Sequence, residues 1–307
     1  MDVFQNYAVV NITASRLQFI ELEKISNQIL INNIGQSFLS PSINFDEPVE
    51  EIILPQIQNS FDEIKIRNNF RSKPVSFTLP PEIFFTIQLP YDDSLTQKEI
   101  REEFNWEISQ LFPFIPVDDL ALKFYELDNK FLPGKNNALV VALPKKFLVL
   151  IKNFCGINEL QPKLIDNASI SANSFINSVS NEMNKPIIVN LYNSKNSMTL
   201  FINNLSKPAF VKVFNKHNGE VISAIVKELK QDRFSKFFNQ FPVGATISGE
   251  DIGSDSLEQL EQELKMRFKV FNPFDFIKFK SDYTSHEIPL DYYSSFTPSA
   301  GVALRFN

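Results

Sequence analysis

Residues 7–22 read YAVVNITASRLQFIEL and decide how the rest of the chain is interpreted. Apolar and β-branched residues fill both ends of this stretch, and the short polar run from Thr13 to Arg16 separates them. Strands favour β-branched and aromatic side chains, and a polar break between two such runs favours a turn. The stretch therefore predicts two strands joined by a tight turn.

The same order of elements recurs in the second half of the chain. Residues 28–35 predict a third strand after the first hairpin. Residues 186–190 and 197–202 predict a second hairpin around a polar turn, and residues 208–214 predict its third strand. The two halves therefore form an internal repeat in topology, although their residues differ.

Apolar spacing and breaker residues place the remaining elements. Helices are expected at 49–64, 95–111, 145–153, 168–178, 221–238 and 256–268, and further strands at 74–79, 83–89, 120–127, 138–143, 164–165, 245–249 and 270–271. Ser94, with Gln97 completing a capping box, is expected to begin the second helix, and Gly156 to end the third. Pro133-Gly134 predicts a turn, and residues 281–296 predict a loop.

Composition is that of a soluble globular protein. The 307 residues suggest about two domains, and the net charge of −6 does not favour nucleic acid or an anionic membrane surface. The lone cysteine, Cys155, is expected to be a buried small side chain in a reducing compartment. Neither a secretory signal nor a run of apolar residues long enough to span a bilayer is found, so we expect a cytoplasmic protein without direct membrane insertion.

No pattern in the chain indicates catalysis. His217 and His286 lack metal-ligand spacing, and no phosphate-loop, dinucleotide-binding or nucleophile-elbow string occurs. Trp106 is expected on the apolar face of the helix at 95–111 and therefore in the protein core, with Leu111 on the same inward face. The acidic residues of that helix are expected to be a solvated surface; they are Glu102, Glu103 and Glu107.

Several local strings resemble the type IV pilus assembly protein family PilM, which is related to the cell-division actin FtsA. They are Gln88-Leu89-Pro90, Glu99-Ile100-Arg101, Trp106-Glu107, Phe112-Pro113-Phe114-Ile115-Pro116, Leu122-Lys123-Phe124, Lys163-Leu164-Ile165-Asp166, Asn272-Pro273-Phe274 and Ala300-Gly301-Val302-Ala303-Leu304-Arg305. The similarity spans nearly the whole chain and is most specific around Trp106.

The resemblance implies an α/β protein with the actin-like, ribonuclease H-like, two-lobe fold and an FtsA/PilM-type inserted α/β subdomain. It places the first lobe at 1–80, the inserted subdomain at 81–157 and a return to the first lobe at 158–180. The second lobe is expected at 181–295, and a C-terminal segment at 296–307 is expected to return to the first lobe.

The resemblance also locates a nucleotide cleft, and this chain departs from the family pattern at each of its loops. The first family loop reads Asp-Ile-Gly-Ser-x-x-x-Lys, the second Asp-x-Gly and the third Ser-Gly-Gly-Gly. The corresponding positions here are Asn11, Thr13 and Gln18 in the first, Asn190 and Tyr192 in the second, and Ser248 and Gly249 followed by Glu250-Asp251 in the third.

These substitutions favour a degenerate cleft. Carboxylates that would hold Mg²⁺ become neutral amides, and glycines that would admit phosphate acquire side chains. We therefore expect a pseudo-ATPase with no cofactor and no metal. The alternative is an ATP-binding protein of the PilM/FtsA type that uses altered phosphate loops.

The resemblance implies a non-catalytic scaffold that binds a membrane partner. We expect the cytoplasmic tail of a PilN-like bitopic protein to lie in a groove between the first subdomain and the insert, and to recruit the chain to the inner membrane of a type IV pilus or type II secretion-like assembly platform. A third interpretation is the cytoplasmic part of a type II secretion linker protein. The sequence leaves open which machine is served and whether the chain self-associates.

Overall fold

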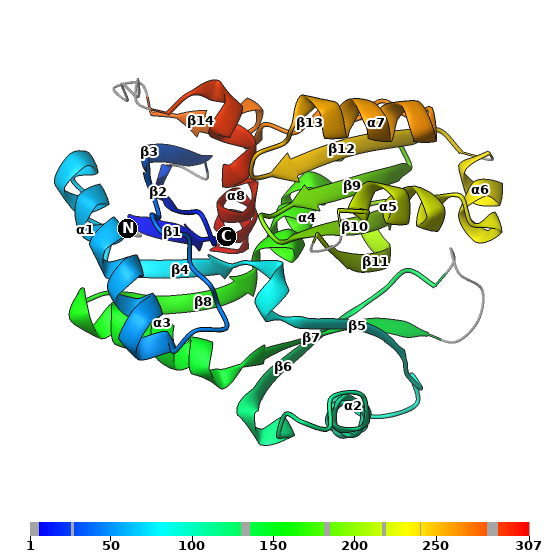
Figure 1. The fold of residues 1–307 in the computed structure, drawn as a ribbon, viewed down its shortest axis with the longest axis horizontal. Helices are drawn as coiled ribbons and strands as arrows, with labels where there is room; N and C mark the ends of the chain where they lie inside the picture. The colour runs from blue at the N-terminus through cyan, green and yellow to red at the C-terminus, as the bar shows by residue number, and fades with distance from the viewer. Residues whose placement is uncertain are drawn as a thin grey trace.

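Three β-sheets organise the computed structural model, which describes residues 6–25, 28–129, 136–180, 185–216, 219–239, 241–280 and 288–306 (Figure 1). The first sheet has the order β14-β3-β2-β1-β4-β8, the second β11-β10-β9-β12-β13 and the third β5-β7-β6. Helices α4 and α8 lie between the first two sheets, and the third sheet lies to one side of both (Figure 1).

The strands are bounded as follows. The first sheet contains β1 (Tyr7–Ile12), β2 (Arg16–Ile25), β3 (Gln28–Phe38), β4 (Pro74–Leu79), β8 (Gln161–Asn167) and β14 (Lys278–Phe279). The second contains β9 (Ile187–Asn193), β10 (Ser197–Asn204), β11 (Lys207–Asn215), β12 (Val243–Gly249) and β13 (Lys269–Val270), and the third contains β5 (Phe85–Pro90), β6 (Leu120–Glu126) and β7 (Asn137–Pro144).

The helices are α1 (Leu54–Asn68), α2 (Gln97–Leu111), α3 (Lys145–Ile157), α4 (Ala168–Ser178), α5 (Val221–Leu229), α6 (Asp232–Phe238), α7 (Ser254–Leu264) and α8 (Thr297–Ala303). A π-helical turn, η1 (Val49–Ile53), leads into α1. Short 3₁₀ segments are η2 (Pro81–Ile83), η3 (Val117–Asp119), η5 (Pro273–Asp275), η6 (Leu290–Phe296) and η7 (Leu304–Phe306).

The first sheet is covered on both faces, which explains the unbroken apolar run at the start of the chain. On β1, Val10 packs in one core with Phe61 of α1, whereas Val9 packs in another with Phe175 of α4 and Val302 of α8. Successive side chains of a strand point to opposite faces. Both sets are therefore apolar, as is typical of a sheet buried on both sides.

The predicted repeat in topology is confirmed. In the first sheet, β1 pairs with β2 antiparallel and with β4 parallel. In the second sheet, β9 pairs with β10 antiparallel and with β12 parallel. The turn of each hairpin and the end of the parallel strand beside it therefore come together at corresponding places in the two lobes.

Helices α4 and α8 are packed closely enough to require a glycine. A Cβ atom on Gly301 would lie 1.8 Å from the carbonyl oxygen of Ser171 in α4. Any larger residue would push the two helices apart. Helices α4 and α8 therefore form a tightly packed layer between the first and second sheets (Figure 1).

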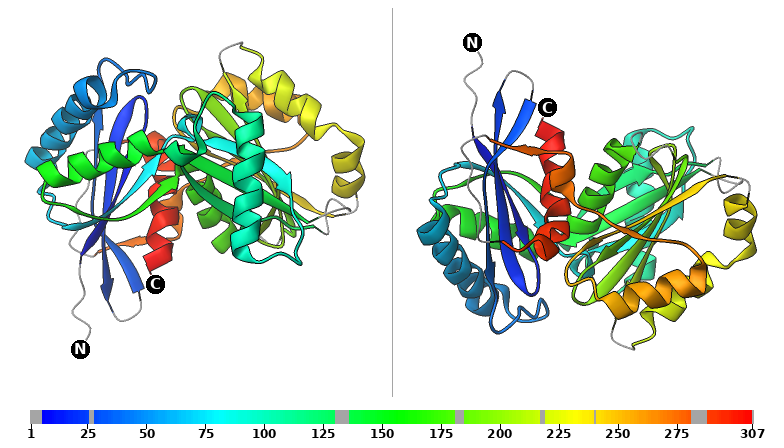
Figure 2. Two further views of the ribbon diagram at one scale, coloured as in Figure 1. Left: turned by 90° about the horizontal axis from the view of Figure 1, so that it is seen from below. Right: turned by 90° about the horizontal axis from the view of Figure 1, so that it is seen from above.

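The third sheet carries α2 on its outer side (Figure 2, left). Ile100, Phe104 and Ile108 are buried against strands β5, β6 and β7. Sheet and helix form a separate small core, in which an edge-to-face contact joins Phe104 to Phe124 at 5.2 Å between ring centroids.

The termini of two predicted helices are corrected by the structure. Thr96, not Ser94, caps α2, because Thr96 Oγ1 accepts from the backbone N–H of Glu99 at 3.3 Å while the Glu99 carboxylate accepts from the N–H of Thr96 at 2.8 Å. Helix α3 runs through Gly156 to Ile157. It ends later because Asn158 Nδ2 donates to the carbonyl of Phe154 at 2.9 Å and satisfies the last turn.

Two further expectations need correction. The single helix predicted at 221–238 is two helices, α5 and α6, with a break at Lys230 where the Glu228 side chain accepts from Gln231 and Arg233. The loop predicted at 281–296 contains η6 in its described part. The predicted turn at Pro133-Gly134 lies outside the described residues.

Within the described ranges, no helix is both long enough and apolar enough to cross a membrane. Cys155 is a buried free thiol, as expected, and it packs in one core with Phe61 of α1 and Phe77 of β4. Burial raises its pKa to about 12, so the thiolate form is disfavoured at neutral pH.

Candidate functional site

Two neutral amide side chains, Asn11 and Gln18, lie within the first hairpin. Asn11 and Gln18 face each other across β1 and β2, and Asn11 Nδ2 donates to Gln18 Oε1 at 3.2 Å. Thr78 Oγ1 donates to Asn11 Oδ1 at 2.8 Å, and Gln18 Nε2 donates to Ser295 Oγ at 2.6 Å. All four residues are buried or part-buried, so these side chains satisfy one another without a ligand.

A second group of amides lies under the second hairpin. Asn190 Nδ2 donates to Asn173 Oδ1 at 3.1 Å, and Thr246 Oγ1 donates to Asn190 Oδ1 at 3.2 Å. Asn203 Nδ2 donates to the same oxygen of Asn173 at 2.9 Å. Asn11 and Asn190 therefore belong to two separate hydrogen-bonded groups, one in each lobe.

Tyr192, two residues beyond Asn190, is an interior side chain. It is 1% exposed and packs with Ala168 and Ala172 of α4. Burial, with further contributions from Glu250 and Glu82, raises its pKa well above the usual value, so the phenol stays neutral.

The end of β12 is shaped by a close backbone contact. Gly249 has φ +112°, and a Cβ atom there would lie 2.1 Å from the carbonyl oxygen of Asn193. The next residue, Glu250, donates its backbone N–H to that same oxygen at 2.8 Å. Ser248, just before the glycine, is fully buried and its hydroxyl has no hydrogen-bond partner among the described residues.

The carboxylate of Glu250 enters the turn of the first hairpin. Thr13 Oγ1 donates to Glu250 Oε2 at 3.0 Å, the Ser15 hydroxyl donates to the same oxygen, and Arg16 Nε lies 3.6 Å from it. Arg16 Nη2 also donates to Asp251 Oδ1 at 2.5 Å. The turn that the sequence placed beside the phosphates of a ligand thus holds a carboxylate of the other lobe.

The surroundings of this carboxylate are nearly dry. Glu250 is 1% exposed and Arg16 is 2% exposed. The rings of Phe38 and Tyr292 lie 5.2 and 5.0 Å from the Arg16 guanidinium carbon, within the range of a cation–π contact. Burial raises the pKa of Glu250, and the opposing effects of Ser15, Arg16 and Thr13 are smaller than those of burial and the charge of Glu82 together.

A second carboxylate crosses in the opposite direction. Glu82, in η2 just after β4, accepts from Ser194 Oγ at 2.9 Å and from Ser197 Oγ at 3.2 Å. Ser194 lies in the turn between β9 and β10, and Ser197 is the first residue of β10. Each hairpin turn therefore receives a carboxylate from a segment that follows a strand of the other sheet.

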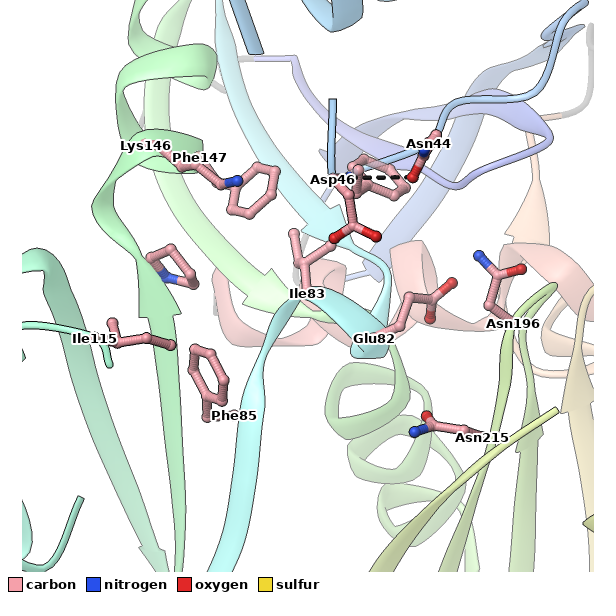
Figure 3. A pocket seen from close by; sticks show the side chains of 12 residues that line it. Asn44, Asp46, Glu82, Ile83, Phe85, Ile115, Lys146, Phe147, Asn196 and Asn215 are labelled. Atoms are coloured by element: carbon pink, nitrogen blue, oxygen red, sulfur yellow. Dashed lines mark hydrogen bonds between the residues drawn. The ribbon is translucent and has the colours of Figure 1, made fainter. Parts of the chain in front are cut away.

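A pocket of about 600 Å³ lies where the first lobe, the third sheet and the second hairpin meet (Figure 3). It is lined by Asn44, Phe45, Asp46, Glu82, Ile83, Phe85, Ile115, Pro144, Lys146, Phe147, Asn196 and Asn215. Ile115 and Phe85 lie on one side in Figure 3, and Glu82, Asn196 and Asn215 lie on the other. We call this the junction pocket; it offers apolar contact and hydrogen-bonding groups together.

The structure corrects the expectation for Trp106. Its side chain is 61% exposed, whereas Phe104 is fully buried. Trp106 is two positions after Phe104, and residues two apart in a helix are separated by about 200° around its axis. Trp106 therefore points away from the sheet on which Phe104 packs. Leu111, expected inward, is 52% exposed at the end of α2.

No metal site is found among the residues that the structure describes, since no group of three or more His, Cys, Asp or Glu side chains is placed to hold an ion. His217 and His286 lie outside those residues. The sequence missed the role of Glu82, Ser194 and Ser197, because the contacts join positions more than a hundred residues apart and no local pattern marks them.

Comparison with known proteins identifies the fold. No protein-family model matches the chain, and no curated protein matches it. A chain of the PilM–PilN type IV pilus biogenesis complex superposes with a TM-score of 0.71 at 17% identity, covering 97% of this chain and 98% of that one. A Bacteroides thetaiotaomicron protein of unknown function with an actin-like ATPase fold gives a TM-score of 0.55 at 11% identity, covering 88% and 91%. The chain therefore has a PilM-like, actin-like α/β fold, as predicted.

Proposed function

We propose that this protein is a non-catalytic scaffold of a type IV pilus or type II secretion-like assembly platform at the inner membrane. In this proposal it resides in the cytoplasm and reaches the membrane by binding the cytoplasmic tail of a bitopic, PilN-like protein. The similarity of the fold to PilM over nearly the whole of both chains supports it.

The side chains of the cleft fit a metal-bound triphosphate poorly, which supports a scaffold without ATPase activity. Mg²⁺ prefers carboxylate oxygens and water, but Asn11 and Asn190 offer amides that already bond to other residues. Phosphates bind where backbone N–H groups are open to them, but Thr13 and Tyr192 add side chains at the positions of two family glycines.

One observation carries this part of the proposal: the buried Glu250 carboxylate lies against the hydroxyls of Thr13 and Ser15. A triphosphate placed at this turn would meet a second anion in a site of low polarity. Like charges in such a site repel strongly. An ATP-binding protein with altered loops remains the competing function, and Gly249, which keeps a left-handed backbone, is the feature that favours it.

The junction pocket is the place that we assign to a peptide tail. Apolar and aromatic side chains with a few polar groups are typical of sites that bind a ligand specifically. An extended peptide could place apolar side chains against Phe85 and Ile115 while its polar groups meet Asn196 and Asn215. The pocket therefore provides chemistry suited to recognition without requiring a reaction.

The test uses fluorescent peptides that cover the cytoplasmic tail of the bitopic membrane protein encoded beside this chain, with binding followed by anisotropy. Asn215→Arg introduces a long side chain at an exposed position of the pocket and should weaken binding about tenfold or more, equivalent to about 1.4 kcal/mol. The control Glu258→Arg changes an exposed position on α7 and should bind like the parent. Failure of every tail peptide to bind the parent protein would refute the proposal.

A further inference from the structure

We infer that the two lobes are held closed by a pair of reciprocal carboxylate latches, and that Glu82 links the state of the junction pocket to this closure. The first latch is Glu250 in the Thr13–Arg16 turn, and the second is Glu82 in the turn containing Ser194 and Ser197. The identity of the pocket's occupant rests on the proposed function; the latches do not.

The reciprocity follows from the repeated topology. Glu82 follows β4, which lies parallel to β1, and Glu250 follows β12, which lies parallel to β9. Each carboxylate therefore leaves the corresponding strand of its own lobe and enters the hairpin turn of the opposite lobe. Two equivalent contacts of this kind oppose any rotation that separates the lobes.

The two latches are incomplete in the same way. In each glutamate, Oε2 accepts the hydroxyl hydrogen bonds, while Oε1 is buried and has no partner among the described residues. A buried carboxylate oxygen without a partner costs free energy. Each carboxylate therefore binds a hairpin turn through Oε2, while its unpaired Oε1 favours an exchange of hydrogen-bond partners.

The charges around the two carboxylates couple them. Arg16 faces Glu250 and also forms an ion pair with Asp251, the residue that follows Glu250 in the chain. Lys216 follows β11 and donates to the carbonyl oxygen of Ser194. Burial lowers the pKa of Lys216, and the charges of Glu250 and Glu82 oppose that effect. The charge of Glu82 likewise acts on Glu250. The two latches also meet in the chain, because the backbone N–H of Glu250 donates to the carbonyl of Asn193, the neighbour of Ser194. Displacement of one carboxylate therefore disturbs the other.

Glu82 also belongs to the junction pocket. Together with Asn196, from the turn that it holds, it forms part of the pocket wall (Figure 3). A molecule in the pocket that drew the Glu82 carboxylate toward itself would move Oε2 away from Ser194 and Ser197. Occupation of the pocket would then weaken the contacts of Glu82 with Ser194 and Ser197. Because both latches join the same two lobes, the contacts of Glu250 would weaken as well.

Amide hydrogen exchange tests the latches without any partner molecule. The reporting amides are Thr13, whose N–H binds the carbonyl of Arg16; Ser194, whose N–H binds that of Ser197; and Glu250, whose N–H binds that of Asn193. Glu82→Ala should accelerate exchange not only at Ser194 but also at Thr13 and Glu250, by about tenfold, as expected for loss of hydrogen bonds to a charged group. Exchange in strands β5 to β7 should stay as in the parent.

Four further variants, one of them a control, complete the experiment. Glu250→Ala should accelerate exchange at Ser194, and Glu82→Gln, which keeps an acceptor for the serines, should restore most of the protection. Ser194→Ala removes one donor of the second latch and should reproduce the effect of Glu82→Ala in weaker form. Glu258→Ala, at an exposed position on α7, should change nothing.

The inference is overturned if Glu82→Ala affects only the turn around Ser194, because the latches would then act independently. It is also overturned if exchange rises equally in β5 to β7, because the change would then be a general loss of stability. Either result leaves the peptide-binding proposal standing, since no peptide enters the experiment.

Discussion

Single residues decide what the turn of the first hairpin can hold. Glu250 brings a carboxylate to a turn whose side-chain hydroxyls and guanidinium group would suit an anion, and the chain supplies that anion itself. Removing water from such a group costs free energy, which the hydrogen bonds from Thr13 and Ser15 offset in part. The raised pKa of Glu250 records the remaining cost of its charge.

The raised pKa has a definite effect on stability. Below the ordinary carboxyl pKa of 4.5, Glu250 is protonated in both the folded and the unfolded protein. As pH rises above that value the unfolded chain releases its proton first, so the free energy of unfolding falls until the folded-state pKa is passed. Ionisation of Glu250 is therefore a destabilising contribution that is complete at high pH.

Glu250→Gln should remove this contribution because glutamine does not titrate and can still accept from the hydroxyls. The free energy of unfolding of the parent, minus that of the variant, should decrease as pH rises from 4.5. Glu250→Ala should instead lose about 1–3 kcal/mol, because buried donors are left unpaired. Urea unfolding between acidic and neutral pH measures both; a difference independent of pH would contradict the assignment.

At the scale of elements, the repeated hairpins were predictable because their signals are local. Apolar runs separated by polar turns marked β1, β2, β9 and β10 within a few residues. The α2 cap was displaced by two residues because two overlapping capping boxes, at Ser94 and Thr96, fit the same sequence, and only the second closes in the structure. Local patterns thus indicate that an element exists better than they indicate where it begins.

The inward face of α2 was predictable, but the position of its tryptophan was not. Ile100, Phe104 and Ile108 recur at helical spacing and are buried. Trp106 falls outside this spacing, so its predicted place on the apolar face was wrong, and its side chain is 61% exposed. Periodicity identified the middle of the buried face, but it failed at the end of the helix, where Leu111 is 52% exposed.

Two variants of α2 separate these interpretations by their effects on stability. Phe104→Ala should cost about 3–5 kcal/mol because it opens a cavity in the small core of the third sheet. Trp106→Ala should change the free energy of unfolding by less than about 0.5 kcal/mol, because the side chain is mostly exposed. Chemical unfolding followed by circular dichroism measures both, and equal losses would show that Trp106 is buried in solution.

At the scale of the whole molecule, the sequence predicted the actin-like fold but not how its lobes meet. The fold could be predicted because strings distributed along the chain resemble one family and the two halves repeat one topology. The contacts of Glu250 and Glu82 span 112 to 237 residues and could not be read from spacing. Their geometry exists only after both lobes have formed.

The account of the whole molecule depends on a cleft that does not bind nucleotide. In the folded protein the donors that would meet phosphate already hold Glu250, and the amides that replace acids are satisfied by other amides and hydroxyls. We therefore propose that function depends on shape and surface, and the junction pocket offers apolar contact and hydrogen-bonding groups together.

Calorimetric titration of the full chain with Mg-ATP tests this claim most directly. The account predicts no measurable heat of binding. Thermal unfolding in the presence of Mg-ATP should likewise show no shift of the midpoint, whereas a true ligand in hundredfold excess over its dissociation constant would stabilise the native state by about 2.7 kcal/mol. Saturable binding of one Mg-ATP per chain with micromolar affinity would contradict it.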